Sequence, residues 1–284
     1  MPNGGGGTGR GASALPGLVD THCHLVLLEE RGLLHRALEE AAAAGVEQIV
    51  SVGLNLDDSE RNRRLAEAHP GVFFTVGWHP HEPAPPTGAQ LRALDELLAH
   101  PRAVAVGEIG LDQFWRPGYH EVPLGVQQRS LAAMLELAAG RTKPVVIHDR
   151  DSHEDVLGAL GDRTRLGGGV MHCYSGDLAF AERCVAAGLL TSYAGTVTFP
   201  RSEGIQAAAA GIGDDAVLLE TDAPFLAPVP FRGRPNLPGY VTATATRVAE
   251  LRGVPAGALA ERCGANARRL FNLPDPASGD RVGD

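Results

Sequence analysis

Two histidines separated by one residue lie near the start of the chain, in the stretch "GLVDTHCHL" (residues 17–25). On an extended strand, side chains at positions i and i+2 point to the same face, so His22 and His24 can reach one metal ion while Cys23 points away. Imidazole nitrogen is a common zinc ligand. Because so short a pattern also occurs by chance, the pair alone is better explained by two half-buried histidines with local hydrogen bonds.

Further ionisable residues lie at or near the C-terminal ends of other apolar stretches. They are His79, His81, Glu108, His148, His172 and Asp222. Histidines and carboxylates without a thiolate form a nitrogen and oxygen ligand set, which suits Zn, Mn, Fe, Ni or Mg. The set is too large for one open catalytic ion, whereas two ions about 3.5 to 4 Å apart and bridged by a carboxylate would use it fully.

The two carboxylates in this set have different expected roles. Glu108, in "AVGEIGLD", has glycines on both sides that let metal ions approach the backbone, so we expect it to bridge them. Asp222, in "LLETDAP", is expected to bind a metal and to take a proton from water, since a metal lowers the pKa of its bound water and makes hydroxide available at neutral pH. This pairing predicts hydrolysis. We expect Asp112 to support the ligands and Asp151 to begin a helix.

The apolar stretches that carry these residues alternate with amphipathic or Ala-rich segments, in which Gly45 and Gly140 are expected to stop helices. Because parallel neighbours need a crossover, strands that are each followed by a helix predict a parallel sheet. The eight strands are expected at residues 17–25, 47–54, 72–80, 103–112, 143–150, 168–176, 189–197 and 215–224. Eight such units in about 250 residues predict an α/β fold, the (β/α)8 TIM barrel, with the metal site at the C-terminal face of the strands. The alternative is an open doubly wound sheet, but none of its glycine-rich phosphate-binding turns is present.

The composition restricts domain organisation and location. We expect a disordered Gly-rich tail over residues 1–14, a single domain over residues 15–273 and a flexible tail over residues 274–284. The chain has no apolar run of 18 residues and no secretion signal at its start, so we expect no membrane contact and a cytoplasmic location. Four scattered cysteines without a Cys-x-x-Cys pair argue against a disulfide framework.

Charge restricts the partners and the chemistry. A net charge of −9 argues against a surface that binds nucleic acid everywhere, so a polyanion site has to be a local patch of metal and arginine. Lys143 is the only lysine among 25 basic residues, which leaves almost no candidate for lysine chemistry.

In several motifs the chain resembles the TatD-family metal-dependent hydrolases, or TatD-type deoxyribonucleases, of the amidohydrolase-like barrel superfamily. The matching stretches, in family order between residues 18 and 272, are "DTHCHL", "GWHPH", "AVGEIGLD", "PVVIHDRD", "GVMHCYSG" and "LLETDAPFLAP", with a weaker match in "RGRPNLPGYV". The resemblance implies that the metal ligands are His22, His24, Glu108, His148, His172 and Asp222. It further implies that Glu108 bridges two divalent ions (Mg, Mn or Zn), that Asp222 is the catalytic base, and that His79 and His81 contact substrate phosphate or water.

The resemblance also implies a substrate class: a 3′ to 5′ exonuclease, or a related phosphodiester hydrolase, that binds DNA or another nucleic acid at the barrel mouth, and we expect a monomer. Arginines in the expected mouth loops can hold phosphates, and nearby aromatic residues can stack on bases. These residues are Arg150, Arg201, Arg232 and Arg234, with Trp78, Trp115, Tyr174 and Phe225.

This sequence departs from the family pattern at the expected rim of the site, which concerns specificity rather than chemistry. The departures are Gln113 and Phe114 in place of an aromatic pair, Pro200 in place of a polar or basic residue, and Pro235 and Leu237 in place of a basic residue and a glutamate.

Two alternatives to a nuclease remain open. The first is a metal-dependent amidohydrolase or esterase that acts on a small molecule. Many such barrels use a carboxylated lysine as the bridge on strand 4, but that place is held by Glu108, and Lys143 lies about 16 Å from the expected mouth. The second is a barrel without catalysis, which the complete set of ligands and the intact base disfavour.

Overall fold

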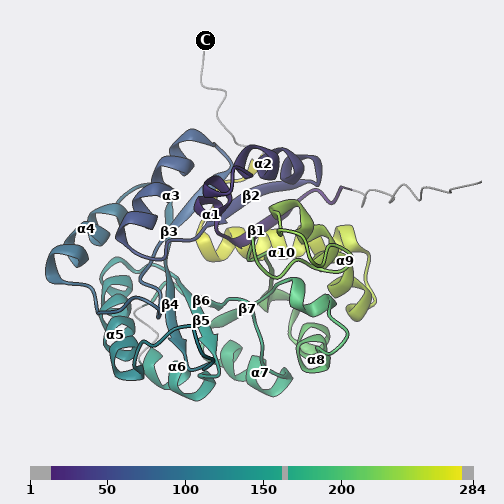
Figure 1. The fold of residues 1–284 in the computed structure, drawn as a ribbon. Helices are drawn as coiled ribbons and strands as arrows, with labels where there is room; N and C mark the ends of the chain where they lie inside the picture. Colours follow the sequence, from purple (N-terminus) through teal and green to yellow (C-terminus); the bar gives the residue numbers. More distant parts are fainter. Residues whose placement is uncertain (1–13, 162–165, 277–284) are drawn as a thin grey trace, which may run out of the picture.

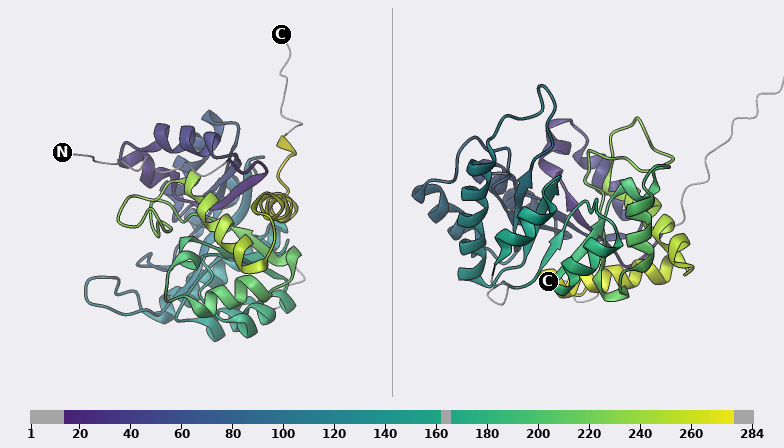
Figure 2. Two further views of the ribbon diagram at one scale, coloured as in Figure 1. Left: turned by 90° about the vertical axis from the view of Figure 1, so that its right-hand side faces the viewer. Right: turned by 90° about the horizontal axis from the view of Figure 1, so that it is seen from below.

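The computed structural model describes residues 14–161 and 166–276. Eight parallel strands follow one another in sequence order, each paired with the next, and helices surround them (Figures 1 and 2). The strands are β1 (Leu18–Cys23), β2 (Val46–Ser51), β3 (Val72–Val76), β4 (Ala103–Asp112), β5 (Val145–Arg150), β6 (Gly169–Met171), β7 (Leu189–Tyr193) and β8 (Val217–Leu219). The predicted TIM barrel is therefore confirmed.

In the helical layer, one α-helix follows each strand except β1 and β8, which two helices each follow. The helices are α1 (Leu25–Glu30), α2 (Leu34–Ala43), α3 (Leu56–Ala68), α4 (Gly88–Leu98), α5 (Leu124–Arg141), α6 (His153–Leu160), α7 (Leu178–Ala186), α8 (Glu203–Gly211), α9 (Val241–Arg252) and α10 (Ala256–Phe271). Gly45 follows α2 as predicted, with a φ of 87°. The stop predicted at Gly140 is wrong: α5 continues to Arg141, and Thr142 ends it with a φ of 49°.

Several strands end earlier than the sequence pattern predicts, most clearly β6 and β8. Cys173 and Asp222, which the predicted strands included, have φ values of 45° and 56°. This left-handed conformation is incompatible with an extended strand. The polar residues that follow the two strands therefore lie in turns at the mouth of the barrel, outside the strand ladder.

The barrel closes where the first strand meets the segment after the last one. The backbone N–H of Asp222 donates to the carbonyl of His22 at 2.9 Å, and the N–H of His24 donates to the carbonyl of Ala223 at 2.8 Å. Closure of the sheet thus brings three predicted metal ligands together directly.

The opposite end of the barrel is closed by apolar packing. Side chains from the first half of several strands, such as Val19, Phe73 and Val104, form one buried cluster with Ala267 and Phe271 of α10. Helix α10 therefore covers the end of the barrel away from the predicted ligands (Figure 1). Within the described ranges, no helix combines the length and apolarity needed to cross a membrane. The predicted tails, residues 1–14 and 274–284, lie mostly outside the described residues.

Candidate metal centre

All six predicted metal ligands meet at the C-terminal face of the barrel. His22, Glu108 and His148 lie on β1, β4 and β5. The other three follow strands: His24 comes directly after β1, His172 directly after β6, and Asp222 three residues after the end of β8. Five of the six are buried, with His22 fully so and Asp222 9% exposed. Ionisable groups at this density are stable only when they are paired or bound to an ion.

The carboxylate of Glu108 lies between two groups of histidines. Its Oε2 atom is 3.4 Å from His22 Nε2 and 4.0 Å from His24 Nε2. Its Oε1 atom is 2.7 Å from His148 Nδ1 and 3.0 Å from His172 Nε2. Each oxygen therefore faces a different pair of imidazoles, which is the arrangement that a bridging carboxylate requires.

Asp222 completes the group on the β1 side. Its Oδ1 atom is 3.1 Å from His24 Nε2 and 3.8 Å from His22 Nε2. The residue has a φ of 56°, a region that non-glycine residues seldom adopt but that aspartate tolerates. Unusual backbone of this kind is concentrated at functional sites.

The ring nitrogens of the buried histidines fit a metal ion. Both nitrogens of His22 and Nδ1 of His24 are buried and have no hydrogen-bond partner among the described residues. Leaving such a polar atom unpaired costs about 1–3 kcal/mol, so a protein rarely keeps several together without a ligand. With carboxylate oxygens beside them, these nitrogens offer the mixed ligand set that catalytic divalent ions use.

The electrostatics of the site keep its central carboxylate charged. Burial acts to raise the pKa of Glu108, but the positive charge of His172 and the hydrogen bonds of His148 and His172 lower it well below its usual range. Burial also acts to lower the pKa of His148, but hydrogen bonds to Asp112 and Glu108 raise it to about 9. For His79, burial prevails and lowers the pKa to about 4.

A second layer of carboxylates orients the histidines. Asp112 Oδ2 lies 3.3 Å from His148 Nε2, so the expectation that Asp112 supports a ligand agrees with its position. Glu220 Oε1 lies 3.2 Å from His172 Nδ1 and accepts the N–H of Cys173 at 2.7 Å. Sequence reasoning missed Glu220, although a charged residue directly after the apolar "VLL" of a buried strand was a visible signal.

The two histidines of "GWHPH" lie at different depths. His79 Nε2 is 3.5 Å from Glu108 Oε1, whereas His81 Nε2 is 2.9 Å from Asp112 Oδ2. Both line a pocket of about 760 Å³ that is also lined by five of the six proposed ligands, all except His22. His79 thus lies beside the central carboxylate of Glu108, and His81 lies beside the carboxylate of Asp112.

Of the four arginines predicted to hold phosphate, only Arg150 is among the described residues that line this pocket. It donates to the hydroxyl of Tyr119 at 2.7 Å, and its guanidinium lies 3.9 Å from the ring centroid of Phe114. Arg232 instead stacks on Phe199 at 4.0 Å, because its loop turns the side chain onto that ring. Arg116, which sequence reasoning missed, also lines the pocket.

The aromatic residues divide in a similar way. Phe225, 44% exposed, lines the pocket. Trp78 and Tyr174 are buried, and they donate to the carbonyls of Ala84 and Asp177. Trp115 is 75% exposed and lines a smaller neighbouring pocket. The sequence alone does not show which of these aromatic residues are buried and which line a pocket, because they lie in segments without hydrophobic periodicity.

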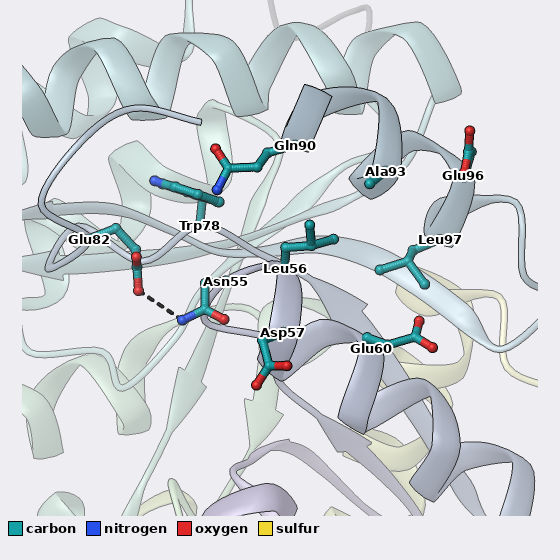
Figure 3. Close-up of a pocket in the computed structure, with 10 residues that line it drawn as sticks. All are labelled: Asn55, Leu56, Asp57, Glu60, Trp78, Glu82, Gln90, Ala93, Glu96 and Leu97. Carbon is teal, nitrogen blue, oxygen red and sulfur yellow. Dashed lines mark hydrogen bonds between the residues drawn. The ribbon is translucent and has the colours of Figure 1, made fainter. Parts of the chain in front are cut away.

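A second pocket, of about 750 Å³, lies beside the first, between α3 and α4 (Figure 3). Asn55 and Glu82 line both pockets, and Asn55 Nδ2 donates to Glu82 Oε1 at 2.9 Å (Figure 3). None of the six predicted ligands lines the second pocket. The chemistry of this face is therefore concentrated in the first.

Comparison with known proteins agrees with this geometry. The family model described as "TatD related DNase" matches residues 19–272. The Bacillus subtilis (strain 168) protein named "Uncharacterized metal-dependent hydrolase YabD" is 35% identical over 257 residues, which cover 90% of this chain and 99% of that protein. The "3'-5' ssDNA/RNA exonuclease TatD" of Erwinia billingiae is 36% identical over 247 residues, which cover 84% of this chain and 93% of that protein.

A solved structure extends the comparison to three dimensions. The crystal structure of YjjV, a TatD homologue from Escherichia coli K12, superposes with a TM-score of 0.84 at 32% identity, covering 92% of this chain and 100% of that one. The chain is therefore a metal-dependent hydrolase that belongs to the TatD-related DNase family.

Proposed function

We propose that this hydrolase is a deoxyribonuclease of the 3′ to 5′ exonuclease type, which cleaves phosphodiester bonds in single-stranded DNA. The observation that supports the proposal most directly is the position of Glu108. Its Oε2 atom faces His22 and His24, and its Oε1 atom faces His148 and His172. Paired metal ions of this kind are typical of nucleases and phosphatases, which stabilise charge on both the attacking and the leaving oxygen.

The residues at the site form two sets, each of which would hold one ion. One ion would be held by Glu108 Oε2 together with His22, His24 and Asp222, and the other by Glu108 Oε1 together with His148 and His172. When bound, divalent ions supply Lewis acidity toward a phosphoryl oxygen and lower the pKa of water toward neutrality. Mg, Mn and Zn all accept ligands of this type.

Asp222 has the position and charge of a general base. Burial acts to raise the pKa of Asp222, but the hydrogen bond and charge of His24 lower it, so the carboxylate is ionised at neutral pH. It lines the pocket, where substrate and water enter. In our proposal the carboxylate of Asp222 takes the proton of the attacking water.

The rim of the pocket supplies the contacts that a nucleotide strand needs. Arg116 and Arg150 provide local positive charge in a chain whose net charge is −9. Tyr119 and Phe225 provide rings on which an unpaired base can stack. The relative from Erwinia billingiae, named as an exonuclease for ssDNA and RNA, supports the same substrate class. The monomeric state and the cytoplasmic location stay predictions.

Digestion of 5′-labelled single-stranded DNA tests the proposal. The protein is stripped of metal with a chelator and reloaded with Mg²⁺, Mn²⁺ or Zn²⁺. We expect the wild type to shorten the strand stepwise from its 3′ end. Asp222→Asn is expected to lower the rate about 10²- to 10⁴-fold, as loss of a general base does. Glu108→Gln is expected to lower it at least as far.

Glu182→Gln, on the exposed surface of α7, is the matched control and is expected to digest DNA at the wild-type rate. A reloaded wild type that leaves DNA and RNA intact would overturn the nuclease proposal. Amide, ester and small phosphate substrates would then be the next to test. Equal rates for wild type and Asp222→Asn would overturn the role of Asp222 as base.

A further inference from the structure

A second group of potential ligands lies outside the six residues of the metal centre. It consists of His81, which follows β3, Asp112, the last residue of β4, and His120, in the segment between β4 and α5. One ligand atom from each of these residues lies within 4.8 Å of the other two. We name this group the outer cluster. It shares no residue with the six ligands of the metal centre.

The atoms of the outer cluster point toward one another. His81 Nε2 lies 2.9 Å from Asp112 Oδ2, and His120 Nε2 lies 3.7 Å from Asp112 Oδ1. The imidazole rings of His81 and His120 are stacked, with their centroids 4.2 Å apart. The side chain of Asp112 is fully buried, so its carboxylate is held in a fixed orientation by the surrounding packing.

The unusual member of the outer cluster is His120. Its side chain is only 10% exposed, and its Nε2 atom has no hydrogen-bond partner among the described residues. The 3.7 Å separation from Asp112 Oδ1 is too long for a hydrogen bond. A buried imidazole nitrogen that faces a carboxylate across such a gap is short of one partner.

We propose that the outer cluster is a third divalent-metal site, in which Nε2 of His81, Nε2 of His120 and the carboxylate of Asp112 bind a borderline transition-metal ion such as Zn²⁺. Two histidines and one carboxylate are the protein ligands of several zinc sites that keep an open coordination position. An ion supplies the partner that His120 Nε2 lacks. Tyr119, whose hydroxyl lies 3.1 Å from Asp112 Oδ2, offers a further oxygen beside the site.

Binding has a defined consequence for the ring proton of His120. The backbone N–H of Val122 donates to His120 Nδ1 at 3.4 Å, which places the ring proton on Nε2. A metal ion at Nε2 moves that proton to Nδ1, so the contact with Val122 is released. The contact is near the limit of a hydrogen bond, so its loss costs little.

An ion can reach the outer cluster from solvent. His81 lines the main pocket above the metal centre, and Asp112 and His120 line the smaller neighbouring pocket of about 400 Å³. Asp112 also lies 3.3 Å from His148 Nε2, so the outer cluster contacts the metal centre through one shared partner. The proposal concerns metal binding and does not depend on the nuclease activity.

Counting bound zinc tests the proposal. Chelator-treated wild type, His120→Gln and His100→Gln are reloaded with Zn²⁺, freed of unbound metal, and analysed by plasma mass spectrometry. His100→Gln is the matched control, because His100 also lies 3.4 Å from a carboxylate, that of Glu67, but belongs to none of the described three-residue ligand groups. We expect His120→Gln to bind one Zn²⁺ per chain fewer than the wild type and His100→Gln to bind the same number.

The result is read as a difference of one ion, so it is informative whether the main centre holds two ions, one or none. Equal zinc content in wild type and His120→Gln would overturn the proposal. In case His120→Gln does not fold, anomalous diffraction at the zinc edge from wild-type crystals gives an independent answer. A peak between His81, Asp112 and His120 supports the site, and a zinc-loaded crystal without that peak overturns it.

Discussion

Glu220 Oε1 lies 3.2 Å from His172 Nδ1 while it also accepts the backbone N–H of Cys173 at 2.7 Å. One buried carboxylate thus holds both the ring of a proposed metal ligand and the turn that carries it. This contact orients the ring of His172 toward Glu108, together with stacking of the ring on His22 at a centroid distance of 3.7 Å.

Glu220→Gln is therefore expected to weaken metal binding and activity without unfolding the protein. Carboxylates that orient metal-binding histidines typically contribute about 10- to 100-fold to metal affinity or activity. The measurement is Zn²⁺ affinity by competition with a chromophoric chelator, with the melting temperature recorded in parallel. The exposed Glu182→Gln is the control, and an unchanged affinity in Glu220→Gln would contradict the role we assign.

Removal of metal is expected to lower thermal stability. In the metal-free protein, His22 and His24 keep buried ring nitrogens without partners, and an ion that binds only the folded state stabilises it by mass action. An ion present at about 100 times its dissociation constant adds about 2.7 kcal/mol. Calorimetry with and without a chelator checks this, and equal melting temperatures would mean that the site holds no ion.

The metal-free protein is also expected to lose stability as the pH rises from 6.5 to 9. Burial acts to lower the pKa of His148, but hydrogen bonds to Asp112 and Glu108 raise it to about 9. The folded state therefore holds a proton that the unfolded state has released, and the stabilisation is fully present below pH 6.5 and lost as the pH passes 9. The pKa values of His24 and His172 are raised as well, so they act in the same direction.

Urea denaturation in the presence of a chelator, at pH 6.5, 7.5 and 9, measures this trend. The pKa of His79, lowered to about 4 by burial, has its effect below the chosen range. The metal-loaded protein is expected to behave oppositely, because histidines must lose protons to bind an ion. A metal-free protein that gains stability between pH 6.5 and 9 would show that His148 is not held as the cation.

Arg150 and Arg232 form a matched pair for substrate binding, because the sequence nominates both and only Arg150 lines the main pocket. Arg150→Met is expected to raise KM for single-stranded DNA about 10-fold, with a smaller effect on kcat, since a phosphate contact is worth one to a few kcal/mol. Arg232→Met is expected to leave KM unchanged. Steady-state kinetics on a labelled oligonucleotide separates the two, and a larger effect at Arg232 would contradict the placement of the substrate.

Gly107 is a position where a side chain would displace the bridging residue. A Cβ atom at Gly107 would lie 2.5 Å from Cβ of Val146 on the neighbouring strand, closer than real carbon atoms approach. Gly107→Ala is expected to destabilise the protein by about 1–3 kcal/mol and to lower its metal content, because Glu108 is the next residue. Gly158→Ala, in an exposed part of α6 with nothing within 4 Å, is the control and is expected to stabilise by up to about 1 kcal/mol. Urea denaturation and metal analysis of both variants check the pair.

The barrel and the six proposed ligands were predictable because each depends on a strong local signal. Apolar strands buried on both faces are recognisable in sequence, and a charged residue at the end of such a strand, such as Glu108 or His148, stands out against them. The C-terminal ends of parallel strands meet at one face, so the shared location of these residues followed from the fold.

The rim of the pocket was less predictable, because it is built from loops whose conformation depends on distant packing. Nothing near Arg232 in the sequence indicates that the side chain stacks on Phe199. Arg116, Tyr119 and His120 lie in a segment between β4 and α5 without hydrophobic periodicity, so their approach to the pocket and to Asp112 appears only in three dimensions.

Because the barrel closes between its first and last strands, the direction of protein synthesis sets the order in which the two halves of the proposed metal centre can be completed. The ligands on the Oε1 side of Glu108 are complete once His172 has been made. Those on the Oε2 side require Asp222, which reaches His22 only when the segment after β8 docks beside β1. A nascent chain, or a truncated one that ends before β8, can hold at most the His148–His172 half of the centre. The half that contains His22 and His24, although its histidines are made first, is therefore completed only after translation has passed β8.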